Sequence, residues 1–171
     1  KSYAIDAAKK AINEHLDRIR LKGEVVDSAI ISTYKINYEI KGCPLVSILI
    51  PNKDHVQDLR TCLDSITSKS TYSNFEIIVI ENNSILQETF NYYDLIQRND
   101  KIKVVQWKHK FNYSAINNFG FSLAKGEHIL LLNNDTEIIT PNWIEEMLMF
   151  SQRADVGVVG AKLYYPDDTI Q

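Results

Sequence analysis

The stretch Leu130-Leu131-Leu132-Asn133-Asn134-Asp135-Thr136-Glu137 decides the fold, because a short apolar run ends abruptly in two amides and a carboxylate. Such a run is typical of a buried strand in a parallel sheet. Ligands of parallel sheets bind where the carboxyl ends of the strands meet, and the polar side chains would lie at that edge. Carboxylate and amide oxygens suit Mg²⁺ or Mn²⁺, which commonly accompany phosphate groups. The stretch therefore predicts an α/β domain with a metal ion at its carboxyl edge.

Length and composition are those of an ordinary globular protein. The chain has 171 residues, of which 44% are hydrophobic and 24% are charged, enough for one α/β domain and an appendage. A net charge of −3 argues against general nucleic-acid binding. No apolar run is long enough for a transmembrane segment, and the N-terminus does not resemble a signal peptide. Cys43 and Cys62 have no metal-binding spacing, so we expect reduced, packed thiols of a cytoplasmic protein.

Residues 1–43 are expected to form a helix and strand extension ahead of the main domain. Apolar residues at helical spacing predict an amphipathic helix over residues 3–22, which Gly23 would end. Clean alternation over residues 33–40 predicts a half-buried strand that is antiparallel or at a sheet edge. Glycine and proline break this pattern, so the predicted main domain is 44–171.

Strands and helices alternate through the main domain, which predicts a mostly parallel sheet with helices on both faces. The apolar runs predict strands at residues 46–50, 75–80, 102–105, 129–132 and 156–159, with 160–165 as an extension of the sheet. Helix starts are predicted from capping boxes at Asp54 with Gln57 and at Ser84 with Gln87, and from Thr140-Pro141. A helix over residues 114–125 would be closed by Gly126.

Polar loops follow four of these strands and would meet at one edge of the sheet. They comprise residues 51–54, 81–84, 107–112 and 133–135. Each loop alone is ordinary turn chemistry, but together they predict a ligand cleft. Neither the GxGxxG nor the GxxxxGK[ST] pattern is present, so phosphate would have to be neutralised by a metal on Asp135, aided by Lys53 or Lys110.

Six segments in order carry a resemblance to a known family. They are residues 46–54, 75–84, 111–120, 124–127, 132–137 and 160–166. The chain resembles the family 2 glycosyltransferases with the GT-A fold, and is most similar to bacterial rhamnosyltransferase-like members that build O-antigen or cell-wall polysaccharide. The resemblance covers about residues 44–171 and implies a domain whose C-terminal part is truncated.

The resemblance implies a site for a UDP- or dTDP-linked sugar donor. The nucleotide-sugar-binding residues that it implies are Pro51, Asn52, Asp54, Glu81, Asn83, Asn118, Gly120, Asn133 and Asn134. Asp135 would hold Mg²⁺ or Mn²⁺. Asn133 stands where most members have the first carboxylate of the DXD motif, so the metal should bind less tightly here.

The resemblance also implies sugar transfer with inversion to a saccharide or lipid-linked acceptor, in cell-surface polysaccharide synthesis. The general base would lie beyond Gln171. Asp167 and Asp168 are the nearest candidates within the chain, but Pro-Asp-Asp is ordinary turn sequence. We expect a cytoplasmic enzyme, at the inner face of the membrane through peripheral association of the full-length protein.

Three alternatives stay open. A nucleotidyltransferase would share the metal and the nucleotide, but usually has a glycine-rich loop that residues 51–54 lack. The chain could also be a catalytically silent nucleotide-sugar-binding module. It could finally be an interaction domain of a larger glycosyltransferase, with residues 1–43 as its docking arm.

Overall fold

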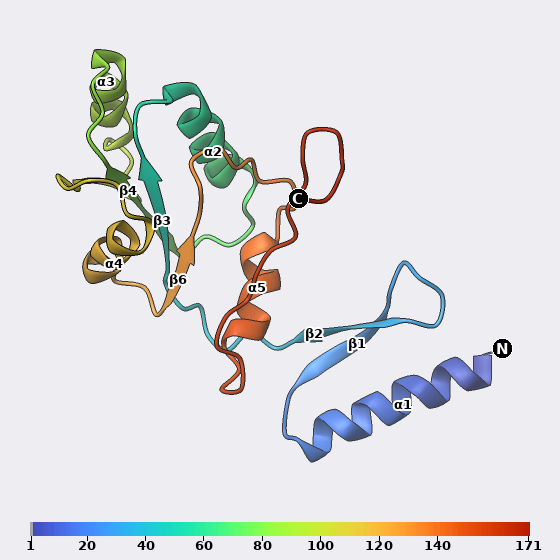
Figure 1. Ribbon diagram of the computed structural model, residues 1–171. Helices are drawn as coiled ribbons and strands as arrows, with labels where there is room; N and C mark the ends of the chain where they lie inside the picture. The colour runs from blue at the N-terminus through green and yellow to red at the C-terminus, as the bar shows by residue number, and fades with distance from the viewer. Residues whose placement is uncertain (1) are drawn as a thin grey trace. The chain divides into compact units, whose positions relative to one another are not determined.

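The computed structural model describes residues 2–171, which divide into two compact units (Figure 1). One unit is Gly42–Ile144, and the other joins the chain up to Lys41 with Glu145–Gln171. The domain boundary expected between residues 43 and 44 stays a prediction. No helix among residues 2–171 is long and apolar enough to cross a membrane.

The unit Gly42–Ile144 is built on a parallel sheet, as the sequence predicts. Its strands are β3 (Val46–Asn52), β4 (Phe75–Glu81), β5 (Ile102–Gln106) and β6 (His128–Leu131), in the order β5-β4-β3-β6. All neighbouring pairs are parallel, and Asn52, Glu81 and Gln106 stand in register at the carboxyl edge. The chain returns from β5 past β4 to place β6 beside β3, so the strand order reverses between β3 and β6.

Helices cover both faces of this sheet, because the connections run in opposite directions. The helices are α2 (Val56–Lys69), α3 (Gln87–Ile96) and α4 (Tyr113–Leu123). Right-handed crossovers place α2 and α3 on one face and α4 on the other. On the α4 face, Leu49, Ile78, Ile80 and Ile116 form a fully buried cluster. Alternate strand residues such as Ile48 and Val79 point to the opposite face and are equally buried.

The capping box predicted at Asp54 and Gln57 is wrong. Helix α2 begins at Val56 after His55, whose φ of 50° is left-handed and whose side chain makes no cap. The Asp54 carboxylate instead accepts hydrogen bonds from the backbone nitrogens of Ile85 and Leu86, both at 3.0 Å. Asp54 therefore caps the start of α3, a helix that begins 33 residues later in the sequence.

The second predicted capping box, at Ser84 and Gln87, is wrong for the same reason. Helix α3 begins at Gln87, and its Ncap residue Leu86 makes no side-chain cap. The Ser84 hydroxyl donates to Glu81 instead. The cap comes from a neighbouring loop, which a local sequence pattern cannot show.

Neither glycine that was expected to end a helix does so. Helix α4 ends at Leu123 with Ala124 extended, and a Cβ at Gly126 would lie 2.6 Å from the Leu45 oxygen and from the Ser47 nitrogen. Gly126 thus lets the chain entering β6 pass close to the start of β3. Helix α1 (Ser2–Arg18) is followed by Arg20 at φ 56°, and Gly23 begins a strand.

The other unit contains an antiparallel hairpin that was only half predicted. Strand β2 (Tyr34–Tyr38) matches the predicted antiparallel strand, and it pairs with β1 (Gly23–Asp27). The sequence interpretation missed β1, because only two of its residues are strong strand formers.

Helix α5 (Trp143–Ser151) contacts this hairpin. Lys35 on β2 forms a 2.6 Å ion pair with Glu146 of α5. The Tyr38 ring packs edge-on against Phe150, at 5.4 Å between ring centroids.

The predicted fifth strand and its extension are also wrong. Residues 156–159 form no strand, and Val158 is 88% exposed. Beyond them a single bridge joins Tyr164 to Ile170 around the turn at Pro166. In that turn the Asp167 carboxylate accepts hydrogen bonds from the Thr169 nitrogen at 3.1 Å and its hydroxyl at 2.7 Å. The turn expected from Pro-Asp-Asp is therefore confirmed.

The close approach at Gly126 gives a first prediction. Gly126→Ala should lower the free energy of unfolding by about 1–3 kcal/mol, because the added methyl group meets backbone atoms that cannot move independently. Gly157→Ala is the matched control, since its Cβ would meet no atom within 4 Å. Urea unfolding of both variants measures the difference, and equal stabilities would contradict the packing argument.

The cap on α3 gives a second prediction. Burial, the largest single influence, raises the pKa of Asp54, but hydrogen bonds from Leu86, Ile85 and Thr89 together hold it below its ordinary value. A depressed native pKa means that the ionised carboxylate stabilises the fold above the ordinary pKa of about 3.9, and that this gain disappears as the pH falls through the native pKa. Asp54→Asn should cost about 1 kcal/mol at pH 7 and less below pH of about 4.

Unfolding curves at pH 7 and pH 3 measure this difference. Asp94→Asn, on the exposed part of α3, is the control and should change little at either pH. A cost for Asp54→Asn that is the same at both pH values would show that the charge of Asp54 contributes nothing.

Candidate functional site

The carboxyl edge of the sheet holds an interlocked set of polar side chains. They come from the ends of β3 and β4, from the loops after β3, β4 and β6, and from helix α3. The structure thereby brings together four of the predicted donor-binding residues: Asn52, Asp54, Glu81 and Asn134.

Glu81 ends β4, and its side chain is only 4% exposed. One carboxylate oxygen accepts from the Ser84 nitrogen at 2.6 Å. The other accepts from the Ser84 hydroxyl and, at 2.9 Å, from the Tyr93 hydroxyl. Both oxygens of Glu81 are thus used inside the protein, where they close the loop after β4. This satisfies a buried charge that would otherwise be costly.

Asn52 ends β3 and is 3% exposed. Its amide nitrogen donates to the Asp54 carbonyl oxygen at 2.9 Å and to the Tyr93 hydroxyl at 2.8 Å. Its amide oxygen accepts from the Asn134 amide at 2.6 Å. Asn52 therefore ties β3 to α3 and to the segment after β6.

Tyr93 joins Asn52 to Glu81, although it is not among the predicted donor-binding residues. It is 4% exposed, and burial, as the largest influence, raises its pKa, so the hydroxyl keeps its proton. Asn82 lies in the predicted polar loop 81–84 but was not named as a donor-binding residue, and its amide donates to the carbonyls of Trp107 at 3.2 Å and His109 at 3.0 Å. The partners of both residues could not be predicted, because they lie in other segments of the chain.

The loop after β4 also carries exposed groups. Asn83 has φ 59°, is exposed, and donates to the His109 carbonyl at 2.9 Å. The amides of Asn82 and Asn83 thus hold the loop after β5 against the loop after β4. In the loop after β5, the centroid of the Trp107 ring lies 4.7 Å from that of His109 and 5.4 Å from that of Phe119 on α4.

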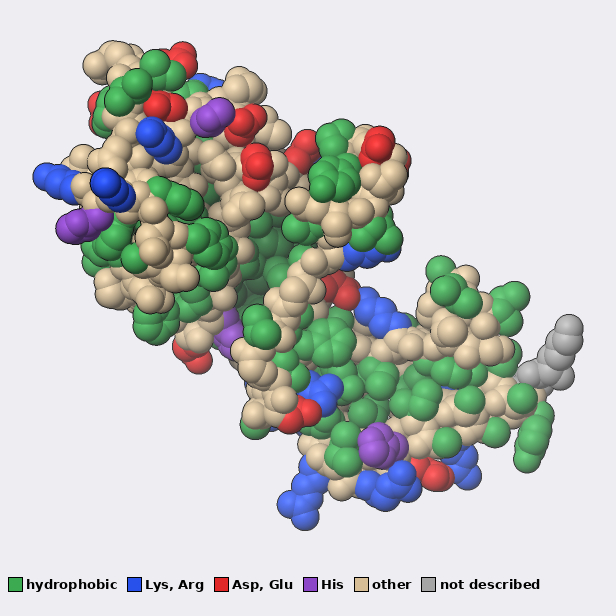
Figure 2. All heavy atoms as spheres, viewed as in Figure 1, with side chains coloured by type: hydrophobic (Ala, Val, Ile, Leu, Met, Phe, Trp, Pro, Cys, Tyr) green, Lys and Arg blue, Asp and Glu red, His purple; other side chains and the backbone are tan. Residues whose placement is uncertain are grey.

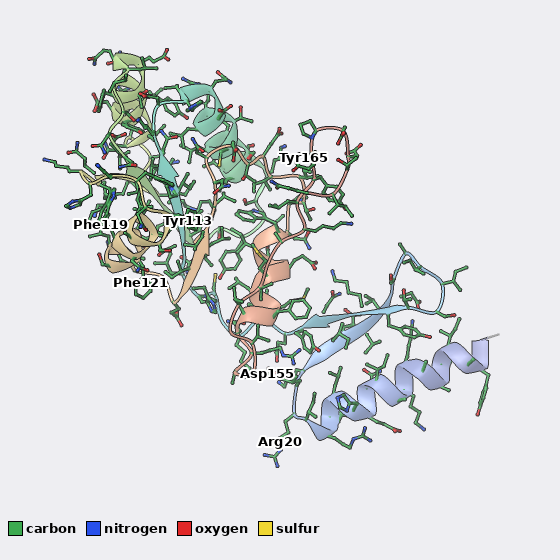
Figure 3. All side chains as sticks on the ribbon, viewed as in Figure 1. Arg20, Tyr113, Phe119, Phe121, Asp155 and Tyr165 are labelled. Atoms are coloured by element: carbon green, nitrogen blue, oxygen red, sulfur yellow. The ribbon has the colours of Figure 1, made fainter. Side chains whose placement is uncertain are left out.

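Helix α4 carries two further predicted residues, which have different surroundings. Asn118 is exposed, whereas Gly120 is buried where its Cβ would meet the side chains of Ile80 and Leu49. Gly120 thus brings α4 close to β3 and β4. Figure 3 shows Tyr113, Phe119 and Phe121 projecting from this helix, and Tyr113 and Phe121 are exposed.

The segment Asn133–Asp135 follows β6. Asn133 and Asp135 are exposed, and Asn134 is half-buried. The Asn133 carbonyl accepts a weak hydrogen bond from the Cys62 thiol at 3.7 Å. Burial, and secondarily the negative charge of Asp135, raise the pKa of Cys62 to about 12. Cys62 is therefore a packed, protonated thiol with the Asp135 carboxylate nearby.

No three His, Cys, Asp or Glu residues among residues 2–171 gather into a metal site. In the segment Asn133–Asp135, Asp135 supplies the carboxylate and Asn134 supplies an amide oxygen. This hard-oxygen donor set fits Mg²⁺ or Mn²⁺ only if the ligand supplies further oxygens, as a diphosphate would.

Figure 2 shows both acidic and basic side chains on the surface in view, and neither sign of charge dominates.

Comparison with known proteins identifies relatives over the whole main domain. A family model described as "Glycosyl transferase family 2" matches residues 47–171. The chain is 42% identical to the uncharacterized protein y4gI of Sinorhizobium fredii, over all of this chain and 19% of that protein. It is 40% identical to the O-antigen biosynthesis protein RfbC of Myxococcus xanthus, over 98% of this chain and 13% of that protein. The chain thus spans less than a fifth of either relative.

A solved structure shares the fold. The mannosyltransferase PcManGT from Pyrobaculum calidifontis, in complex with GDP-Man and Mn²⁺, aligns with a TM-score of 0.66 at 14% identity. The alignment covers 98% of this chain and 46% of that one. The likeness confirms the GT-A fold that the sequence resemblance implied. Because the family model covers most of the chain, this protein belongs to glycosyl transferase family 2.

Proposed function

We propose that the chain is the donor-binding part of a glycosyltransferase that moves a sugar from a nucleotide diphosphate to a saccharide or lipid-linked acceptor. Membership of family 2 and the similarity to an O-antigen biosynthesis protein support this class of reaction. The observation that carries the proposal is the carboxyl edge itself. Buried hydrogen bonds lock the loops after β3, β4 and β6 together, and leave Asn83, Asn133 and Asp135 exposed beside them.

The exposed groups have the chemistry that a nucleotide diphosphate needs. Amides such as Asn83 can both donate to and accept from a base or ribose. Asn134 and Asp135 would hold a divalent ion together with the diphosphate. When bound there, Mg²⁺ or Mn²⁺ would stabilise the negative charge of the departing diphosphate. With one carboxylate in the segment, ion binding should depend on the nucleotide, because fewer anionic ligands offset the loss of hydration water.

The finer features of the reaction are also proposals. We propose transfer with inversion, from a UDP- or dTDP-linked donor, with rhamnose as one candidate sugar. We propose that the general base lies beyond Gln171, and the hydrogen bonds of the Asp167 carboxylate to Thr169 in a turn support this. The reaction would take place on the cytoplasmic side of the membrane, where a lipid-linked acceptor would be reached by peripheral association.

One specific observation favours a second candidate. Asn133 replaces an expected carboxylate, so the chain could bind a nucleotide sugar without transferring it. The discriminating measurement is release of free sugar from a bound donor. Release or transfer by the full-length protein supports the enzyme, whereas binding without either supports a silent module.

The metal assignment gives a third prediction. Asp135→Asn should remove the Mn²⁺-dependent part of nucleotide diphosphate affinity, a loss of at least about tenfold or roughly 1.4 kcal/mol. Calorimetry with UDP, dTDP and GDP, each with Mn²⁺ and with EDTA, measures that part. GDP is included because the structural neighbour binds GDP-Man.

Glu137→Gln is the matched control for this experiment. It removes a carboxylate two residues away that pairs with Lys69 at 2.7 Å. Affinity in the control should stay Mn²⁺-dependent. If the nucleotide diphosphate affinity of Asp135→Asn depended on Mn²⁺ as strongly as that of wild type, the metal would have to be assigned to another residue.

A further inference from the structure

A directed chain of hydrogen bonds runs through the interior of the unit Gly42–Ile144. The Asn134 amide donates to the Asn52 oxygen at 2.6 Å, and the Asn52 amide donates to the Tyr93 oxygen at 2.8 Å. The Tyr93 hydroxyl then donates to the Glu81 carboxylate at 2.9 Å. Every donor points the same way, from the segment after β6 toward the buried carboxylate.

The direction of the chain is imposed by its surroundings. An asparagine amide has two N–H hydrogens, and those of Asn52 go to the Asp54 carbonyl and to Tyr93. A reversed Asn52 would set its oxygen against that carbonyl, an acceptor facing an acceptor. The Tyr93 hydroxyl could not donate to that oxygen either, because its hydrogen already goes to Glu81. Asn52 can therefore present only its oxygen to Asn134.

The orientation of Asn134 follows from this arrangement. Its amide nitrogen faces Asn52, so its amide oxygen, fixed about 120° away in the planar group, is turned away from Asn52. That oxygen belongs to the residue next to Asp135. Hydrogen bonds that run in one direction toward an anion strengthen one another in a low-dielectric interior. Glu81 thus acts on Asn134 from a distance, through Tyr93 and Asn52.

We propose that Tyr93 is a positioning residue of the donor site. Through Asn52 it fixes the Asn134 side chain, and with it the segment Asn133–Asp135, in the geometry that a cation and a nucleotide diphosphate require. The inference rests on the proposed function and extends it to a buried residue of helix α3. Tyr93 touches neither ligand, and acts only through the orientation of Asn134.

Tyr93→Phe tests this role, and Tyr92→Phe is the matched control. The two residues are neighbours on α3 and almost equally buried, and Tyr92 lies under the Arg60 guanidinium, outside the chain of hydrogen bonds. In Tyr93→Phe, Glu81 keeps both bonds from Ser84. A purely structural tyrosine would change overall stability without a selective effect after β6.

The first measurement is hydrogen exchange of the unliganded proteins at a temperature where all are folded. Tyr93→Phe should exchange about tenfold faster in peptides covering residues 131–139, with α4 peptides unchanged. Tyr92→Phe should exchange like wild type in both regions. Equal exchange over residues 131–139 in all three proteins would overturn the proposal.

The second measurement is the ratio of nucleotide diphosphate affinities with Mn²⁺ and with EDTA. The ratio should fall about tenfold in Tyr93→Phe and stay unchanged in Tyr92→Phe, as expected when a group that orients a metal ligand is lost. If Tyr93→Phe does not fold, Asn52→Ala breaks the same chain and should give both effects. An unchanged ratio in a folded variant overturns the positioning role.

The two measurements also separate the inference from the function on which it rests. If wild-type protein binds no nucleotide diphosphate with Mn²⁺, the proposed function is contradicted. The exchange result then still decides whether Tyr93 controls the segment after β6.

Discussion

A carboxylate buried at the end of a parallel strand is the constraint on which the rest of the site depends. A charge in this position is costly unless donors surround it, and Glu81 receives hydrogen bonds from the Ser84 nitrogen, the Ser84 hydroxyl and Tyr93. To supply them, the chain must turn sharply after β4 and must present Tyr93 toward the sheet. Asp54 then caps the helix that carries Tyr93. One buried charge thereby organises segments that are far apart in the sequence.

This constraint divides the polar residues of the edge into two groups. Asn52, Glu81 and Tyr93 are buried and hydrogen-bonded to one another and to the adjoining loops, and they make the edge rigid. Asn83 and Asp135 are exposed and free of that buried set, so they are available to a ligand. A rigid support beneath exposed groups lowers the cost of ordering them when a ligand binds. The family resemblance assigns Asn52 and Glu81 to the same donor site as Asn83 and Asp135, whereas the structure shows that the first two are buried and the last two are exposed.

The parallel sheet was predicted well, because buried parallel strands are continuous apolar runs. All four predicted runs between residues 46 and 132 correspond to strands of the structure. The same rule failed at residues 156–159, where an equally apolar run has no partner strand. Helix starts were wrong where the cap comes from another loop, as with Asp54. The candidate site was predicted as a set of polar loop ends, but its pairings were not. Asn52 lies 41 residues from Tyr93 and 82 from Asn134, and no local pattern encodes such contacts.

The central claim is that the loop ends after β3, β4 and β6 form one nucleotide site with its metal at Asp135. Paramagnetic broadening of backbone amide signals by Mn²⁺ tests it most directly. With a nucleotide diphosphate present, substoichiometric Mn²⁺ should broaden first the amides of residues 133–137, and then those of residues 51–54 and 81–84, because broadening falls steeply with distance. Broadening centred elsewhere in the chain would contradict the account. Broadening of the same residues to the same extent without a nucleotide would also contradict it.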